Sequence, residues 1–137
     1  MPRNVLITAG ASGIGKAMAE AYEVNGDNVW IADSNKEQLN NCSKKWKKSH
    51  IDVRDESAVE KLFEYIENDW GTIDILCANA GIKGPTALIE EISLTEWKEC
   101  IEVNIDGIFL FCKLTVPLMK KQKSGSIIIT SSTAGIF

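Results

Sequence analysis

The chain has 137 residues, which is enough for one domain, and 45% of them are hydrophobic while 25% are charged. This balance is typical of a soluble globular domain with its own core. The formal net charge of -4 and the pI near 5.0 argue against a nucleic-acid partner, because phosphate binding needs clustered positive charge.

Three residue types that often form special sites show no such pattern here. The four cysteines form neither a CxxC pair nor a Cys/His ligand set, so we interpret them as reduced thiols. His50 has no second ligand near it in the sequence, which disfavours a metal site. Four lysines around Trp46 are compatible with a phosphate-binding patch, but a solvated helix end before a strand explains them more simply.

No segment of the sequence predicts export or membrane insertion. The chain runs from Met1 into the strand-like Val5–Ile7 without a basic region and a cleavage site. The longest apolar run, 105–114, contains Asp106 and Lys113 and is too short to cross a bilayer. We therefore expect a cytoplasmic protein without a membrane partner.

Short apolar runs alternate along the chain with amphipathic segments of helix length, a pattern typical of strand-helix-strand units in a parallel sheet. The predicted strands are Val5–Ala9, Asn28–Asp33, Ser49–Val53, Ile73–Ala78 and Ser126–Ser131. The predicted helices are Ile14–Asn25, Asp55–Trp70 and Thr95–Lys121. Pro117 predicts a kink or a separate turn in the last helix, because proline removes an intrahelical hydrogen bond. The expected fold class is α/β, a three-layer Rossmann-type doubly wound sheet.

A glycine-rich turn, Gly10 to Gly15, separates the first strand from the first helix. Glycines at this place let backbone amides approach a pyrophosphate, and the helix N-terminus favours its negative charge. Alone, the pattern is also compatible with an ordinary turn that uses glycine for its conformation. Positions 10–16 also spell GxxxxGK, but Ala17 stands where a P-loop NTPase needs Ser or Thr for magnesium.

Asp33 ends the second strand, close to the position at which an acidic side chain meets the ribose hydroxyls of a bound dinucleotide. A carboxylate there repels a 2'-phosphate. Because no arginine follows Asp33 and Ser12 precedes Gly13, the sequence favours NAD over NADP. The alternative is an ordinary turn aspartate.

In order along the chain, these motifs resemble those of the short-chain dehydrogenase/reductase family from Arg3 onward. The turn 8–15 resembles TGxxxGIG with Ala9 in place of the first glycine, and 78–81 resembles NNAG with Ala78 in place of the first asparagine. Asp52-Val53 resembles the pair that meets the adenine, and Asn79 the residue that braces the sheet. The resemblance implies the strand order 3-2-1-4-5 and a set of cofactor-binding residues. They are Gly10, Ser12, Gly13, Ile14, Gly15, Asp33, Asp52, Val53, Asn79, Ala80 and Gly81.

Two further residues match the family's catalytic positions. Asn104 matches the asparagine that holds a water in a proton relay, and Ser132 the serine that hydrogen-bonds the substrate oxygen. The family's Tyr-x-x-x-Lys should follow Ser132 by about a dozen residues, with the two side chains one helical turn apart. Neither Tyr22 nor Tyr65 has a lysine four positions later. We therefore expect 1–137 to be the front part of a domain that continues past the apolar residues 133–137.

The resemblance implies an NAD-dependent oxidoreductase that transfers a hydride between the nicotinamide and a secondary alcohol or ketone. An alternative is a catalytically incomplete fragment or pseudoenzyme that only binds NAD. A homodimer or homotetramer is implied by the resemblance alone. The isolated chain should be poorly stable, because its fifth strand would expose an edge and its long helix would lack a packing partner.

Overall fold

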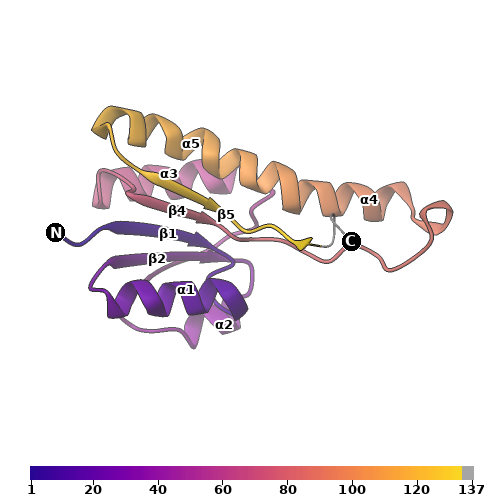
Figure 1. Cartoon of the computed structure of the whole chain (residues 1–137), viewed down its shortest axis with the longest axis horizontal. Helices are drawn as coiled ribbons and strands as arrows, with labels where there is room; N and C mark the ends of the chain where they lie inside the picture. The colour runs from indigo at the N-terminus through magenta and orange to yellow at the C-terminus, as the bar shows by residue number, and fades with distance from the viewer. Residues whose placement is uncertain (134–137) are drawn as a thin grey trace.

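The computed structural model describes residues 1–133, and its centre is a five-stranded parallel sheet (Figure 1). The strands are β1 (Asn4–Thr8), β2 (Asn28–Asp33), β3 (Lys47–His50), β4 (Ile75–Ala78) and β5 (Ser126–Ile129). Their order is β3-β2-β1-β4-β5, which confirms the predicted order and the predicted fold class. The expectation about the chain end falls partly on residues 134–137, outside the described residues.

Helices cover both faces of the sheet. They are α1 (Gly13–Val24), α2 (Lys36–Asn40), α3 (Glu56–Asp69), α4 (Leu94–Ile101) and α5 (Gly107–Gln122). A short 3-10 turn, η1 (Ile89–Glu91), precedes α4, and a π turn, η2 (Glu102–Asp106), joins α4 to α5. In Figure 1, α1 and α2 lie on one side of the sheet, and α3 and α5 lie on the other.

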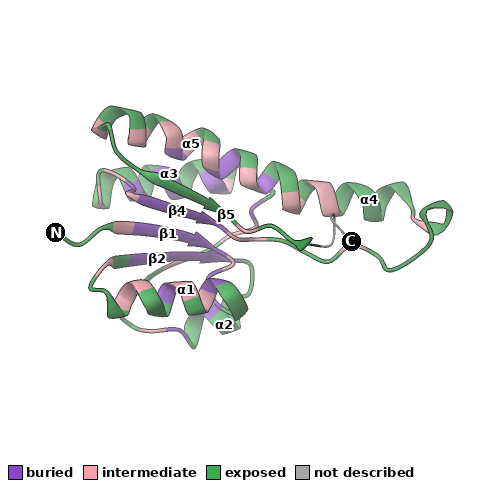
Figure 2. Ribbon diagram, viewed as in Figure 1, coloured by how far each residue is buried: buried purple, intermediate pink, exposed green. Residues whose placement is uncertain are grey.

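Alternation along the inner strands divides the core into two halves, because successive side chains of a strand point to opposite faces. Leu6 and Leu76 pack in the cluster that contains Phe63 of α3 and Phe111 of α5. Ile7 and its neighbours pack in the cluster beneath α1 and α2. The strands β1, β2 and β4 are accordingly the most buried strands of the sheet (Figure 2).

The third strand differs from the prediction Ser49–Val53, since it begins at Lys47 and ends at His50. At a sheet edge, lysine side chains reach solvent, and charged residues protect the free strand edge from other chains. Lys47 Nζ lies 2.8 Å from Asp69 Oδ2 and Lys48 Nζ donates to the Cys42 carbonyl. The interpretation of this lysine cluster as a helix end was therefore wrong, because α2 ends at Asn40, Lys44 and Lys45 lie in a turn, and Lys47 and Lys48 lie in β3.

Two helical features also differ from prediction. The short helix α2 was not predicted; its N-cap, Asn35, accepts a hydrogen bond from the Gln38 amide at 3.0 Å. The long helix predicted over Thr95–Lys121 is divided by the π turn η2, whereas α5 continues through Pro117. A π turn inserts one extra residue into a helix and leaves no simple sequence pattern.

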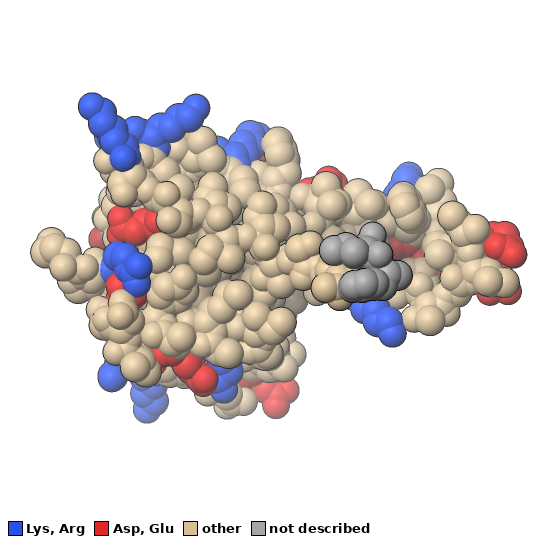
Figure 3. Space-filling view, in the orientation of Figure 1, with Lys and Arg blue, Asp and Glu red and all other residues tan. Residues whose placement is uncertain are grey.

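The strand β5 lies at the edge of the sheet and is exposed along its whole length, as was expected of the fifth strand. Its isoleucines include Ile129, of which 52% is exposed. The view in Figure 3 shows a central face of the molecule with few charged side chains. No helix in the described part of the chain is long and apolar enough to span a bilayer. The low stability of the isolated chain stays a prediction.

Candidate functional site

The glycine-rich turn follows β1 at the carboxyl end of the sheet, and close packing explains two of its glycines. A Cβ on Gly10 would lie 2.5 Å from Ile31 Cγ2, inside the sheet's own side chains. A Cβ on Gly15 would lie 2.1 Å from the Ala9 carbonyl oxygen. Gly10 therefore lets the turn pass close to β2, and Gly15 lets the start of α1 pass close to the backbone directly after β1.

Gly13 differs from these two glycines, because it needs conformational freedom rather than space. Its φ is +51°, in the left-handed region, and a Cβ added there would meet nothing within 4 Å. Ser12 is the N-cap of α1 and is extended, and 63% of Ile14 is exposed. The turn thus presents the N-terminus of a twelve-residue helix to open space, a geometry that favours an anion.

Asp33, at the end of β2, is directly attached to this turn. Its Oδ2 accepts a hydrogen bond from the Ala11 amide at 3.0 Å, and its Oδ1 accepts one from the Asn35 amide at 2.9 Å. Only 8% of Asp33 is exposed. The structure therefore brings the predicted acidic residue and the predicted glycine-rich turn to the same edge of the sheet.

A cleft of about 190 Å³ lies beside the turn at the carboxyl ends of the strands. Of the predicted cofactor-binding residues, five line it: Asp33, Asp52, Val53, Ala80 and Gly81. The other lining residues are Ala9, Ala32, Ser34, Ile51, Arg54, Ile82, Glu99 and Val103. The residues Gly10, Ser12, Gly13, Ile14 and Gly15 lie on the neighbouring turn and do not line the cleft.

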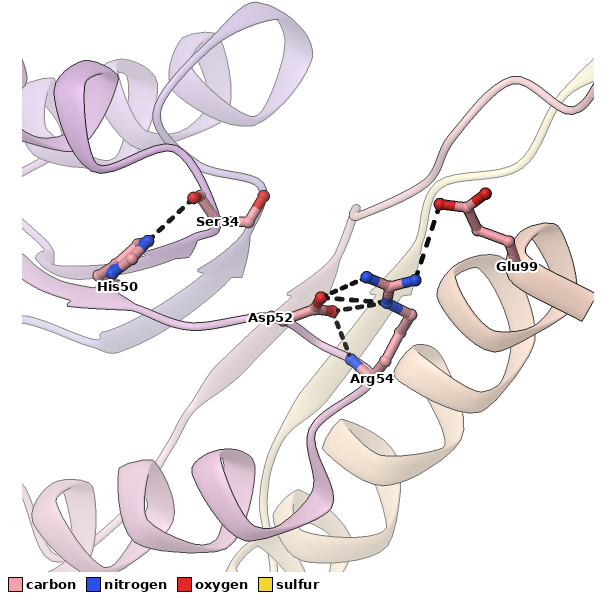
Figure 4. Close-up of polar contacts among 5 residues, drawn as sticks. All are labelled: Ser34, His50, Asp52, Arg54 and Glu99. Atoms are coloured by element: carbon pink, nitrogen blue, oxygen red, sulfur yellow. Dashed lines mark hydrogen bonds and ion pairs between the residues drawn. The ribbon is translucent and has the colours of Figure 1, made fainter. Parts of the chain in front are cut away.

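Arg54 is the only cation among the described residues that line this cleft, and it is bound to two carboxylates (Figure 4). Its Nε lies 3.0 Å from both oxygens of Asp52, and one terminal nitrogen lies 2.6 Å from Asp52 Oδ2. The other terminal nitrogen lies 3.8 Å from Glu99 Oε1 on α4. The hydrogen bonds from Arg54 hold the pKa of Asp52 below its usual value. Asp52 is therefore an anion fixed in place.

Figure 4 also shows the single histidine of the chain. His50 Nε2 lies 3.0 Å from the backbone carbonyl oxygen of Ser34, which ties the end of β3 to the turn after β2. Within residues 1–133, no group of three or more His, Cys, Asp or Glu side chains has a geometry suited to a metal ion.

The segment after β4 is joined to β1 by a hydroxyl and an amide. The Thr8 hydroxyl accepts hydrogen bonds from the backbone amides of Asn79 and Ala80, each at 2.9 Å. Asn79 Nδ2 donates to the carbonyl oxygens of Thr8 at 3.3 Å and Ala9 at 3.5 Å. Thr130, just beyond β5, donates from its hydroxyl to Asn79 Oδ1 at 2.8 Å. Asn79 thus lies between the ends of three strands and does not itself line the cleft.

The two predicted catalytic residues lie in different surroundings. Asn104 lies in the π turn η2, and its side chain binds both backbone groups of Ile82, a cleft residue. Ser132 follows β5 and is exposed. Neither side chain lines the cleft, so their roles toward a substrate stay predictions.

Several site residues were not found from the sequence. Ala9 was noted only as a departure from the family motif, yet it lines the cleft with a φ of +51°. For Arg54 the sequence offered one signal, because this residue stands two positions after Asp52, a predicted cofactor-binding residue. Glu99 and Thr130 had none, because their contacts depend on the three-dimensional arrangement of helices and strand ends.

Comparison with known proteins places this geometry among related folds. The sequence pattern of the family described as short chain dehydrogenase matches residues 3–137. A 3-oxoacyl-acyl-carrier-protein reductase of Thermotoga maritima is 35% identical, over 96% of this chain and 56% of its own length. The meso-2,3-butanediol dehydrogenase of Serratia marcescens is 34% identical, over 96% and 54%.

Solved structures that resemble this chain have similar descriptions. A 3-ketoacyl-ACP reductase of Sinorhizobium meliloti is 33% identical with a TM-score of 0.89, covering 96% of this chain and 54% of that protein. A short-chain dehydrogenase of Streptomyces avermitilis has a TM-score of 0.93 at 26% identity, covering 100% and 52%. The chain spans about half the length of the curated relatives it matches, 51% to 56% for the first two. This chain belongs to the short-chain dehydrogenase family.

Proposed function

We propose that this chain forms the NAD-binding part of an oxidoreductase that transfers a hydride between a nicotinamide cofactor and a secondary alcohol or ketone. The observation that carries the proposal is the hydrogen bond from the Ala11 amide to the Asp33 carboxylate. It places an acidic side chain, suited to ribose hydroxyls, next to a glycine-rich helix N-terminus, suited to a diphosphate.

The choice of NAD over NADP is supported by the charges of the cleft. The described side chains that line it include three carboxylates, Asp33, Asp52 and Glu99, and one guanidinium, Arg54. Because Arg54 is already bound to Asp52 and Glu99, it is not free to neutralise a 2'-phosphate. A second phosphate group would therefore meet an excess of negative charge.

The adenosine would lie between Asp33 and the Asp52-Val53 pair, and the diphosphate would lie over Gly13. When bound, the nicotinamide supplies the hydride acceptor or donor. By analogy with the family, Ser132 would hold the substrate oxygen and Asn104 would support the proton relay. Cytoplasmic residence and assembly into a dimer or tetramer stay predictions.

Isothermal titration calorimetry with NADH and NADPH tests the proposal. We expect NADH to bind at least about tenfold more tightly than NADPH. The 2'-phosphate of NADPH would lose a charge-assisted hydrogen bond to Asp33 and would be repelled by its carboxylate. Asp33→Asn should reduce this ratio to within about threefold, because it removes the repelling charge. Asp74→Asn is the matched control, since Asp74 accepts a hydrogen bond from the Asn4 amide at the opposite end of the sheet. Equal binding of the two cofactors would refute the choice of NAD, and binding of neither would refute the proposed function.

The activity of the whole protein is tested with NAD and a panel of secondary alcohols. Ser132→Ala should lower kcat by about a hundredfold or more with little change in the affinity for NADH, because the serine acts on the substrate oxygen. Unchanged turnover in this variant would exclude the proposed role of Ser132.

A further inference from the structure

Thr130 has a contact that distinguishes it from the other residues of its strand end. Its backbone amide continues the parallel ladder by donating to the Ala78 carbonyl at 3.1 Å. Its hydroxyl donates to Asn79 Oδ1 at 2.8 Å. Thr130 is therefore attached to β4 through both its main chain and its side chain, two residues before Ser132.

The direction of each hydrogen bond follows from the chemistry of the partners. Asn79 lies between two carbonyl oxygens, of Thr8 and Ala9, and the Thr130 hydroxyl. Carbonyl oxygens only accept, so the Asn79 nitrogen must face β1 and its oxygen must face Thr130. This leaves the Thr130 hydroxyl as the donor that keeps the amide in this orientation.

The chain of hydrogen bonds from Thr130 through Asn79 ends at Ala9, a residue with an unfavourable backbone conformation directly before the glycine-rich turn. Ala9 has a φ of +51°, a conformation that costs an L-residue with a Cβ about 1–2 kcal/mol. Its carbonyl oxygen accepts from Asn79 Nδ2 and also lies where a Cβ on Gly15 would collide. A residue in an unfavourable conformation persists only where its surroundings hold it there.

We propose that Thr130 is a positioning residue for the cofactor site, because its hydroxyl fixes Asn79 and Asn79 in turn fixes the Ala9 end of the glycine-rich turn. The inference rests on the proposed function, since the site it positions is the proposed NAD site. It also links the strand end that carries Ser132 to the turn that would hold the diphosphate. Thr130 itself does not line the cleft.

Three threonine variants test this inference. Thr130→Val removes the hydroxyl and keeps the shape, whereas Thr130→Ser keeps the hydroxyl. Thr72→Val is the matched control, because the Thr72 hydroxyl donates to Gln122 Oε1 at the opposite, amino end of the sheet. For each protein, NADH affinity is measured by calorimetry, and amide hydrogen exchange is measured without cofactor.

We expect Thr130→Val to bind NADH about fivefold more weakly, the factor that corresponds to one neutral hydrogen bond. Its amides over 9–13 should exchange about tenfold faster than in the wild type. Thr130→Ser should stay within about twofold on both measures. Thr72→Val should lower the thermal midpoint without changing NADH affinity, which separates positioning from general stability.

The inference is overturned if Thr130→Val matches the wild type in exchange over 9–13, or if Thr130→Ser loses as much affinity as Thr130→Val. It is also overturned if Thr72→Val weakens NADH binding equally. Failure of the wild type to bind NADH would refute the proposed function instead. In that case, the exchange measurement alone still decides whether Thr130 holds the turn.

Discussion

The side chain of Asn104 binds both backbone groups of Ile82. Its Oδ1 accepts from the Ile82 amide at 2.7 Å, and its Nδ2 donates to the Ile82 carbonyl at 2.9 Å. This reciprocal pair fastens the start of the segment between β4 and α4, which extends beyond the sheet in Figure 1, to the π turn. Because Ile82 lines the cleft, Asn104 shapes the cleft wall whether or not it also holds a catalytic water.

Asn104→Asp should loosen this wall while almost keeping the size of the side chain. A carboxylate oxygen would then face the Ile82 carbonyl oxygen, so one hydrogen bond is replaced by repulsion. We expect a loss of about 1–2 kcal/mol in the free energy of unfolding, measured by urea denaturation. Hydrogen exchange at the Ile7 amide in β1, which requires global opening, should accelerate only by the factor that matches this loss, whereas exchange at the Ile82 amide should accelerate further through local opening. Equal exchange at Ile82 in the variant and the wild type would contradict this account.

The inner strands were predictable because strands buried on both faces have continuous apolar runs in the sequence. The apolar run Val29–Ala32 ends at a polar residue, and β2 was predicted with the observed bounds Asn28–Asp33. The edge strand β3 was misplaced because the apolar positions Ile51 and Val53 were read as strand. Val53 instead packs against α5, where a Cβ on Gly107 would lie 2.8 Å from its Cγ2.

The site was predictable only where a motif is continuous in the sequence. The glycine-rich turn and Asp33 could be found from their spacing. The contact between Thr130 and Asn79 depends on the register of β4 with β5, which pairs Ala78 with Ile129. The Asn104–Ile82 pair depends on a π turn, whose extra residue has no periodic signature. Both contacts could therefore be identified only from the three-dimensional structure.

Ala9→Gly should stabilise the fold or leave it unchanged, although glycine normally weakens regular structure. Ala9 has a φ of +51°, which glycine adopts without a steric penalty. The relief of about 1–2 kcal/mol is offset by roughly 0.5–1 kcal/mol of additional backbone entropy in the unfolded state. Urea denaturation measures the difference. A midpoint clearly below that of the wild type would show that the positive φ at Ala9 carries no strain.

The control for Ala9→Gly is Ala17→Gly, an exposed position inside α1. There glycine should cost about 1 kcal/mol, because it lowers helix propensity without relieving strain. The two Ala→Gly variants should therefore differ by about 1–2 kcal/mol in the free energy of unfolding, with Ala9→Gly the more stable.

Thr115→Val should raise stability, because the Thr115 hydroxyl is buried without a partner. The side chain is fully buried in α5, and its oxygen has no hydrogen bond within the described part of the chain. Replacing an unsatisfied hydroxyl by a methyl group of similar shape should contribute about 1 kcal/mol, measured as the free energy of unfolding in urea.

Thr8→Val is the opposite case and serves as the control for Thr115→Val. Thr8 is also buried, but its hydroxyl accepts from the amides of Asn79 and Ala80. Its removal should cost about 1–3 kcal/mol, since two partly buried backbone amides lose their acceptor. If both threonine variants shift stability in the same direction, satisfied and unsatisfied hydroxyls do not differ here as proposed.

The stability of the fold should depend on pH through Asp27, which joins the start of β1 to the turn before β2. Its carboxylate accepts from the Arg3 backbone amide, from the Arg3 guanidinium and from Asn25 Nδ2. Hydrogen bonds from Arg3 hold the pKa of Asp27 well below its usual value. A carboxyl group with a lowered folded-state pKa stabilises the fold above its unfolded-state value of about 3.9. That contribution is lost as the pH falls toward the folded-state pKa.

Asp27→Asn tests this dependence, because the amide cannot carry the charge that Arg3 binds. At pH 7 we expect its thermal midpoint to lie a few degrees below that of the wild type. The difference between the two proteins should be constant from about pH 5 to pH 8 and should shrink as the pH falls below about 4, where Asp27 begins to be protonated in the unfolded chain. Asp69→Asn is the comparison, since the Asp69–Lys47 pair joins two side chains that are each more than 40% exposed and should contribute little. A difference between wild type and Asp27→Asn that stays constant down to pH 2 would show that the charge of Asp27 does not stabilise the fold.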